Sequence, residues 1–141
     1  MRFMIMVRAN AQSESSEPPA DEAIFAEMAT YHEELAKAGV LLDASGLQPS
    51  SRGFRVRYTH GKPLIVDGPF AETKELIAGY TLIQVRSRDE AIEWARRFPA
   101  PFGKNVECEI EVRQLYELED FPKSEGIKSF RKLKENNFKH S

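Results

Sequence analysis

Residues 67–75 carry the side chains of this sequence whose types and spacing are best suited to chemistry. The stretch reads Asp-Gly-Pro-Phe-Ala-Glu-Thr-Lys-Glu, so three carboxylates and one ammonium group lie within nine residues. Asp67 could act as a general base, and Glu72 could pair with Lys74 to orient a polar substrate. A desolvated carboxyl group would have a raised pKa and would be suited to proton transfer. We therefore take Asp67 and Glu72 as candidate catalytic residues.

The same stretch also has a simpler interpretation, as a turn followed by a solvated loop. Gly68 tolerates a positive φ, Pro69 fixes its own φ, and the Asp67 side chain can accept hydrogen bonds from nearby backbone amides. An exposed pair of Glu72 and Lys74 would contribute only about 0–1 kcal/mol. The residue types leave both interpretations open.

Other side chains are expected to complete a ligand site around this loop. The candidates are Lys74, Glu75, Phe70 and Arg55, with Arg57 ranked below them. A cavity between the helices, the sheet and the loop would accept a small polar ligand.

His32 is a third catalytic candidate, because it lies beside Phe25 at the border of an apolar helical stripe where it would be half-buried. A half-buried histidine without a catalytic role is the commoner case at such a position.

Metal and cofactor sites are not expected. His32, His60 and His140 are scattered and have no zinc-ligand spacing with Cys108. The chain also lacks a glycine-rich phosphate loop and a dinucleotide fingerprint. Cys108 is the single cysteine, which fits a reducing compartment, and we expect it to fill core space.

Periodicity predicts the elements that would position these residues. Strands are expected at residues 3–7, 40–47, 54–58, 64–66, 79–85 and 106–113, and helices at 21–38 and 87–98. Ser87 and Glu90 form a capping box that opens the second helix, and Trp94 is expected in the core. Residues 10–19 are polar and end in two prolines, which indicates a mobile loop.

This order of elements is the βαββαβ pattern of a ferredoxin-like α+β sandwich with a hairpin extension. Both helices would pack on one face of the sheet. The strands at 3–7 and 79–85 are apolar on both faces, so the second face must also be covered. A second copy of the sheet would do this and give a face-to-face homodimer. The C-terminal tail is the alternative cover.

The strand at 106–113 shows the clearest alternation. The side expected to face the core carries Val106, Cys108, Ile110 and Val112. The opposite side carries the acidic row Glu107, Glu109 and Glu111.

Residues 117–141 form a charged tail that follows the domain at 1–116. The tail from Lys123 onwards is basic. Its cations are Lys123, Lys128, Arg131, Lys132, Lys134 and Lys139. Ile127, Phe130 and Leu133 recur every three residues, so a short helix and a frayed tail both remain open.

Composition narrows the classes of partner. With 141 residues the chain can form one domain with its own core, and a formal charge of −2 argues against nucleic-acid binding by the whole domain. The apolar runs are too short for a membrane span or a signal peptide, so we expect neither a membrane partner nor export. A cytoplasmic location is expected.

The 67–75 stretch resembles the signature of the DGPF-domain family, within the wider YCII-related superfamily. The similarity continues through Gly46-Leu47-Gln48-Pro49 and Ile77-Ala78-Gly79, and it covers residues 2–116. The resemblance implies a small ferredoxin-like domain that dimerises through its sheet, of the dimeric α/β-barrel type. The wider superfamily also implies a histidine–acid pair with the histidine on the first helix, but that histidine position falls on Met28, one turn before His32.

Three functions remain after this comparison. The first is a small-molecule-binding protein or enzyme with a polar pocket at the 67–75 loop. The second is a non-catalytic dimeric interaction module that has a regulatory partner, since relatives occur with sigma-factor-type transcription regulators. The third is contact of the basic tail with anionic polymers. The residues alone do not decide whether any reaction is catalysed.

Overall fold

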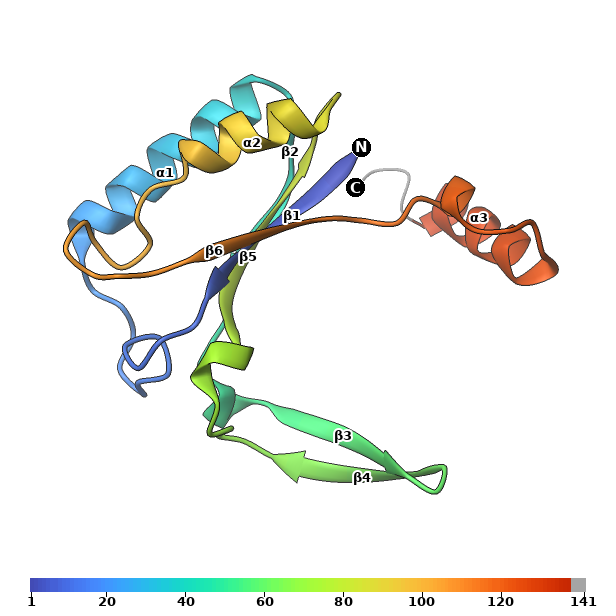
Figure 1. Cartoon of the computed structure of the whole chain (residues 1–141), viewed down its shortest axis with the longest axis horizontal. Helices are drawn as coiled ribbons and strands as arrows, with labels where there is room; N and C mark the ends of the chain where they lie inside the picture. The colour runs from blue at the N-terminus through green and yellow to red at the C-terminus, as the bar shows by residue number, and fades with distance from the viewer. Residues whose placement is uncertain (138–141) are drawn as a thin grey trace.

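The structure is a computed structural model, and it describes residues 1–137 of the chain. Its elements follow one another in the order expected from the sequence, with an additional helix at the end (Figure 1). The strands are β1 (Arg2–Arg8), β2 (Leu41–Gly46), β3 (Phe54–Thr59), β4 (Lys62–Asp67), β5 (Ile77–Gln84) and β6 (Ile110–Gln114). The helices are α1 (Glu22–Lys37), α2 (Arg88–Arg96) and α3 (Glu125–Asn137), with short 3₁₀ turns at Ser50–Arg52, Thr73–Glu75 and Leu118–Asp120.

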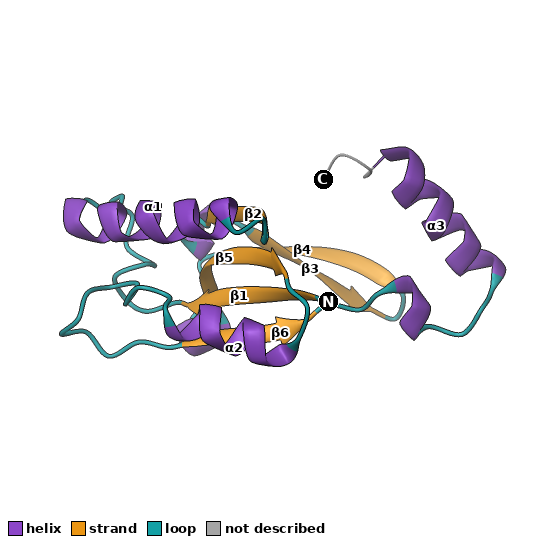
Figure 2. Ribbon diagram, turned by 90° about the horizontal axis from the view of Figure 1, so that it is seen from above, coloured by secondary structure: helices purple, strands orange, loops and turns teal. Residues whose placement is uncertain are grey.

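Four strands form one antiparallel sheet in the order β2-β5-β1-β6, and β3 pairs with β4 in a separate two-stranded ribbon. This strand order is compatible with the ferredoxin-like arrangement expected from the βαββαβ pattern. Helices α1 and α2 lie together over one face of the sheet (Figures 1 and 2). The α+β class is therefore confirmed.

The core lies between these two helices and the sheet. Its buried apolar residues are Phe3, Ile5, Tyr31, Leu35, Val40, Ile83, Val85, Ala91 and Trp94. The Tyr31 ring meets Trp94 edge-on, and its hydroxyl donates a 2.7 Å hydrogen bond to the Trp94 carbonyl. Burial raises the pKa of Tyr31 to about 12. Trp94 is thus a core anchor, as predicted.

The helix ends are set by local sequence. The Asp21 carboxylate accepts from the amides of Ala23 and Ile24 at the start of α1, and Gly39 has a φ of +73° just after its C-cap. Ser87 accepts from the Glu90 amide at the start of α2, which is half of the predicted capping box, whereas the Glu90 carboxylate accepts from the Arg86 amide and not from that of Ser87.

The other face of the sheet is open. Alternation places Met4 and Met6 of β1 beside Leu82 and Tyr80 of β5 on this face, and all four side chains are half-buried. We call these four residues the open-face patch. The expectation that these strands are apolar on both faces is confirmed by this patch.

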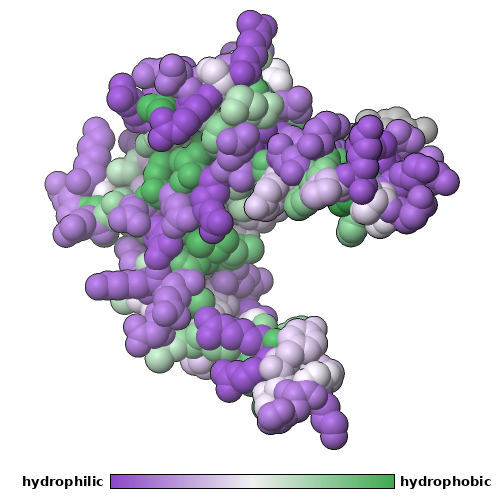
Figure 3. Space-filling model, turned by 45° about the vertical axis from the view of Figure 1, so that its right-hand side comes forward, coloured by the Kyte–Doolittle hydropathy of each residue, from purple (hydrophilic) through white to green (hydrophobic). Residues whose placement is uncertain are grey.

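Two arms extend from the body on the side of the open face. The hairpin arm is β3–β4, which leaves the end of the sheet where β2 finishes and β5 begins (Figure 1). The C-terminal arm, residues 117–137, contains α3 and lies apart from α1 and α2 (Figures 1 and 2). Figure 3 shows hydrophobic surface on the hollow side between the body and these arms.

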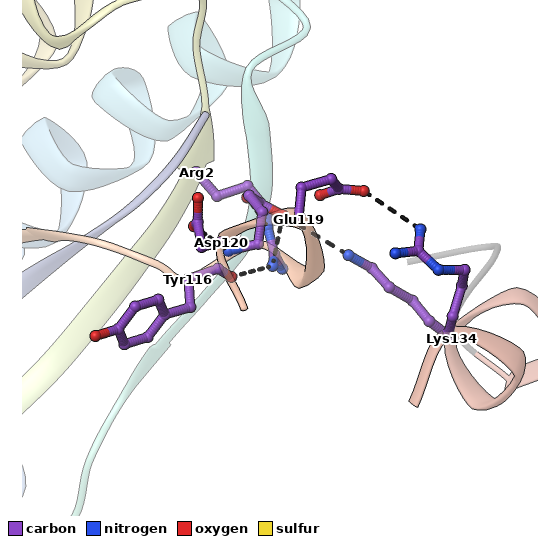
Figure 4. Close-up of polar contacts among 7 residues, drawn as sticks. Arg2, Tyr116, Glu119, Asp120 and Lys134 are labelled. Carbon is purple, nitrogen blue, oxygen red and sulfur yellow. Dashed lines mark hydrogen bonds and ion pairs between the residues drawn. The ribbon is translucent and has the colours of Figure 1, made fainter. Parts of the chain in front are cut away.

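The C-terminal arm is tied to β1 by ion pairs (Figure 4). Arg2 donates to both carboxylate oxygens of Glu117, at 2.9 and 3.1 Å. Lys134 of α3 lies 3.8 Å from the same carboxylate, and Arg131 lies 3.4 Å from Glu119. The short-helix interpretation of this segment is therefore correct up to residue 137, whereas Lys139 and His140 lie outside the described residues.

The strand expected at 106–113 is shorter than predicted. Strand β6 begins at Ile110, and Cys108 is exposed, so the prediction that it fills core space is wrong. Pairing with β1 starts at Val7 and Ile110, and β1 ends at Arg8, so the residues before Ile110 pair with no strand in the described part of the chain. Val106 is likewise exposed, while Ile110 and Val112 pack against the core as expected.

None of the described helices is long and apolar enough to cross a membrane.

Candidate functional site

The 67–75 loop packs against the 3₁₀ turn that precedes the hairpin arm. The Gly68 amide donates a 3.0 Å hydrogen bond to the Gly53 carbonyl. A Cβ on Gly68 would lie 1.9 Å from the Ser50 carbonyl oxygen, which is a backbone atom that cannot move aside easily. Gly68 does not have a positive φ, so its tolerance of left-handed backbone does not explain the glycine here. Glycine is required here by close backbone approach.

A second contact connects three separate loops at the same place. The Ser50 amide donates to the Glu14 carboxylate at 2.8 Å, and the Ser50 hydroxyl bonds to the other oxygen of the same carboxylate. The Phe70 amide in turn donates to the Ser50 hydroxyl at 3.0 Å. We call Glu14, Ser50 and Phe70 the loop interlock. It shows that residues 10–19, expected to be mobile, include a side chain that holds the loop.

The ring of Phe70 also contacts a cationic side chain of the hairpin arm. The Arg55 guanidinium lies 3.7 Å from the centroid of the Phe70 ring, within the range of a cation–π contact. The structure thus brings together two of the residues predicted to bind ligand. Their contact with each other fixes the hairpin arm relative to the loop.

The charged side chains of the 67–75 loop, unlike Phe70, point into solvent. The side chains of Asp67, Glu72, Lys74 and Glu75 are all exposed. Within residues 1–137 these four side chains make no ion pair or side-chain hydrogen bond, so Glu72 and Lys74 do not pair, and Asp67 does not bond to the turn. A single chain therefore does not assemble them into one constellation.

His32 is held on the helix-covered face of the sheet. One ring nitrogen, Nδ1, lies 2.7 Å from the Met28 carbonyl oxygen, which can only accept, so Nδ1 carries a proton. The other, Nε2, lies 2.8 Å from the hydroxyl of Thr81, which is buried in β5. His32 also meets the rings of Tyr31 and Phe98. The structure does not bring it into hydrogen-bond contact with the 67–75 loop.

Arg8 connects the loop to the open face. Its guanidinium lies 2.8 Å from the Glu111 carboxylate and also donates to the Lys74 carbonyl. The Ala9 amide donates to the Leu76 carbonyl at 3.0 Å. The backbone of the loop is therefore anchored at the edge of the open-face patch.

Sequence reasoning missed Glu14, Ser50 and Arg8. Glu14 and Ser50 are 36 residues apart, and nothing in their local sequence indicates that they meet. Arg8 carried a weak signal, because it is the first charge after an apolar strand and thus stands at a sheet end.

A shallow groove of about 440 Å³ lies between α1 and the residues that directly follow α2. Within it Arg97 lies 2.6 Å from Glu34 and stacks over Trp94, 4.2 Å from the ring centroid. None of its lining residues belongs to the 67–75 loop. Among the described residues, no group of His, Cys, Asp or Glu side chains is arranged to hold a metal ion.

Comparison with known proteins agrees with this fold. The YCII-related domain matches residues 1–117. The chain belongs to the YCII-related domain family. It is also similar to the uncharacterized protein R00369 of Rhizobium meliloti (strain 1021), with 30% identity over 102 residues that cover 72% of this chain and 82% of that protein. The match within this YCII-related chain ends where the C-terminal arm begins, so α3 lies outside it.

Proposed function

We propose that this protein is a homodimeric, small-molecule-binding member of the DGPF-type branch of the family, with two sheets packed face to face in a dimeric α/β barrel. The observation that carries the proposal is the open-face patch. Its half-buried apolar side chains lie in the middle of the sheet, on the face that α1 and α2 leave uncovered. Apolar area of this kind is stabilised by burial, and a second identical sheet is the simplest cover.

The pocket is proposed to form between the two copies, around the 67–75 loop. In a single chain, Asp67 and Glu72 extend into solvent without partners among the described residues. The loop backbone is nevertheless fixed by the loop interlock and by Arg8 at the edge of the open face. A copy packed on that face would cover this edge, and burial would supply the desolvation that acid–base chemistry needs. In this proposal Lys74, Glu75, Phe70 and Arg55 remain candidate ligand contacts.

A non-catalytic interaction module with a regulatory partner is the second candidate. Gly68, Phe70 and Arg55 all have structural contacts that explain their presence without a ligand. Both ring nitrogens of His32 are already hydrogen-bonded within the chain, to the Met28 carbonyl and the Thr81 hydroxyl. These contacts favour a structural role for the loop.

The first experiment measures assembly. Sedimentation of the wild-type chain at micromolar concentration should give a dimer, and Leu82→Glu should raise the dimer dissociation constant at least about a hundredfold, because it buries an unpaired charge. Phe25→Glu is the matched control, since Phe25 is 48% exposed on α1 and the same change there should leave the dimer intact. A monomeric wild type would rule out the proposed dimer.

The second experiment separates the two candidate functions. A thermal-shift screen of metabolites compares wild type with Asp67→Asn and Glu72→Gln. A compound that stabilises wild type but neither variant supports a polar binding site at the loop. If no compound stabilises any of the three proteins, the interaction module becomes the better account.

A further inference from the structure

The hairpin arm is strongly basic. Between residues 46 and 66 the chain has four cations and no aspartate or glutamate, and the one carboxylate of the arm is Asp67 at its base, the last residue of β4. The cations are Arg52, Arg55, Arg57 and Lys62. All four are exposed, and none forms an ion pair with another part of the chain described by the structure. The arm also exposes large apolar side chains, with Phe54 63% and Tyr58 74% accessible. Such a surface is suited to an acidic, partly apolar partner.

A matching acidic surface lies just before β6. Glu107 and Glu109 are exposed, and within residues 1–137 neither forms an ion pair. Val106 beside them is 40% exposed, so this segment too combines carboxylates with apolar surface. Glu111 follows on β6, where Arg8 already neutralises it. We call residues 106–109 the acidic segment.

The two surfaces lie at the same end of the sheet but at opposite edges. Strands β2 and β6 are the two edges. The hairpin arm leaves after β2, whose last residue Gly46 pairs with Gly79 near the start of β5. The acidic segment enters β6, and the Arg8 amide at the end of β1 donates to the Glu109 carbonyl at 3.1 Å. Since β1 and β5 are antiparallel, the end of one and the start of the other are adjacent.

A face-to-face dimer can place its two-fold axis in two simple ways. If the axis runs parallel to the strands, corresponding ends of the two sheets lie together, and the β2 edge of one sheet faces the β6 edge of the other. The hairpin arm of one copy then faces the acidic segment of the other. An axis across the strands instead exchanges the ends and keeps the edges, so the arm of one copy lies near the start of β2 and the end of β5 in the partner, where Arg86 is exposed. The first arrangement joins opposite charges, whereas the second brings the basic arm toward another cation.

We infer that the hairpin arm docks onto the acidic segment of a second copy, with the two-fold axis parallel to the strands. This inference rests on the proposed homodimer and specifies its orientation. Because the contact is isologous, each dimer contains it twice. Arg57 and Glu109 are its test residues, since both are exposed and neither belongs to the core or to the loop interlock.

The test uses single charge reversals, measured by sedimentation equilibrium at low salt. Arg57→Glu and Glu109→Arg should each raise the dimer dissociation constant at least about tenfold, because each homodimer then carries two repulsive contacts. Arg86→Glu is the control, as it makes the same charge change at the other end of β5 and should not weaken the dimer. Circular dichroism checks that each variant is folded.

Mixing the two variants gives the decisive result. In a heterodimer of Arg57→Glu with Glu109→Arg, one contact is native and the other is reversed but still complementary. The mixture should therefore form heterodimers in large excess over both homodimers. If both reversals leave a wild-type-like dimer, or if the variants do not prefer each other, the inferred docking is wrong while the homodimer stands. A monomeric wild type would contradict both the inferred docking and the proposed homodimer.

Discussion

At the scale of single residues, Gly68 shows how a motif can be fixed by packing. A Cβ at this position would lie 1.9 Å from the Ser50 oxygen and 2.7 Å from its carbonyl carbon. Gly68→Ala should therefore force the turn away from the loop and lower the free energy of unfolding by about 1–3 kcal/mol. Urea unfolding measures this difference.

Gly46→Ala is the matched control for that substitution. A Cβ at Gly46 would meet no atom within 4 Å, so the same chemical change should leave stability within about 0.5 kcal/mol of wild type. A loss in Gly68→Ala no larger than that in Gly46→Ala would show that close packing does not explain the glycine at position 68.

At the scale of elements, the C-terminal arm should respond to pH through Glu117. The hydrogen bond from Arg2 is the main cause that lowers the pKa of this carboxyl below its usual 4.5. A lowered folded pKa stabilises the docked arm above the unfolded pKa, and this stabilisation is lost as pH falls through the folded value. Protection factors of the α3 amides should therefore fall on acidification from about pH 6 to below pH 4.

The same measurement on Glu117→Gln tests the assignment. A neutral amide cannot form the ion pairs with Arg2 and Lys134, so this variant should show weak protection of α3 at both pH values. Glu93→Gln removes an exposed carboxylate on α2 and should behave as wild type. An unchanged pH response in Glu117→Gln would mean that another group controls the arm.

The sequence predicted those features that depend on neighbouring residues, and it did not predict those that depend on contacts between distant parts of the chain. The periodicities of α1 and β5 are visible in the chain, so their limits were predicted to within about two residues. The loop interlock was missed because it joins Glu14 and Ser50 across 36 residues. Cys108 was misplaced because alternation indicates a strand only where a neighbour is present to pair with it, and β1 ends at Arg8. The exposure of the 67–75 carboxylates likewise depends on tertiary placement.

At the scale of the whole molecule, the open-face patch makes stability depend on concentration. If two sheets share this patch, unfolding also separates two chains, so mass action favours the folded dimer as concentration rises. A hundredfold increase in protein concentration should raise the melting temperature by about 3–6 °C, as followed by calorimetry. Leu82→Glu should melt at one temperature across the same range, because its unfolding no longer includes dissociation. A wild-type melting temperature that is independent of concentration would mean that a single chain tolerates Met4, Met6, Tyr80 and Leu82 half-exposed, and that the two arms extend toward something other than a second copy.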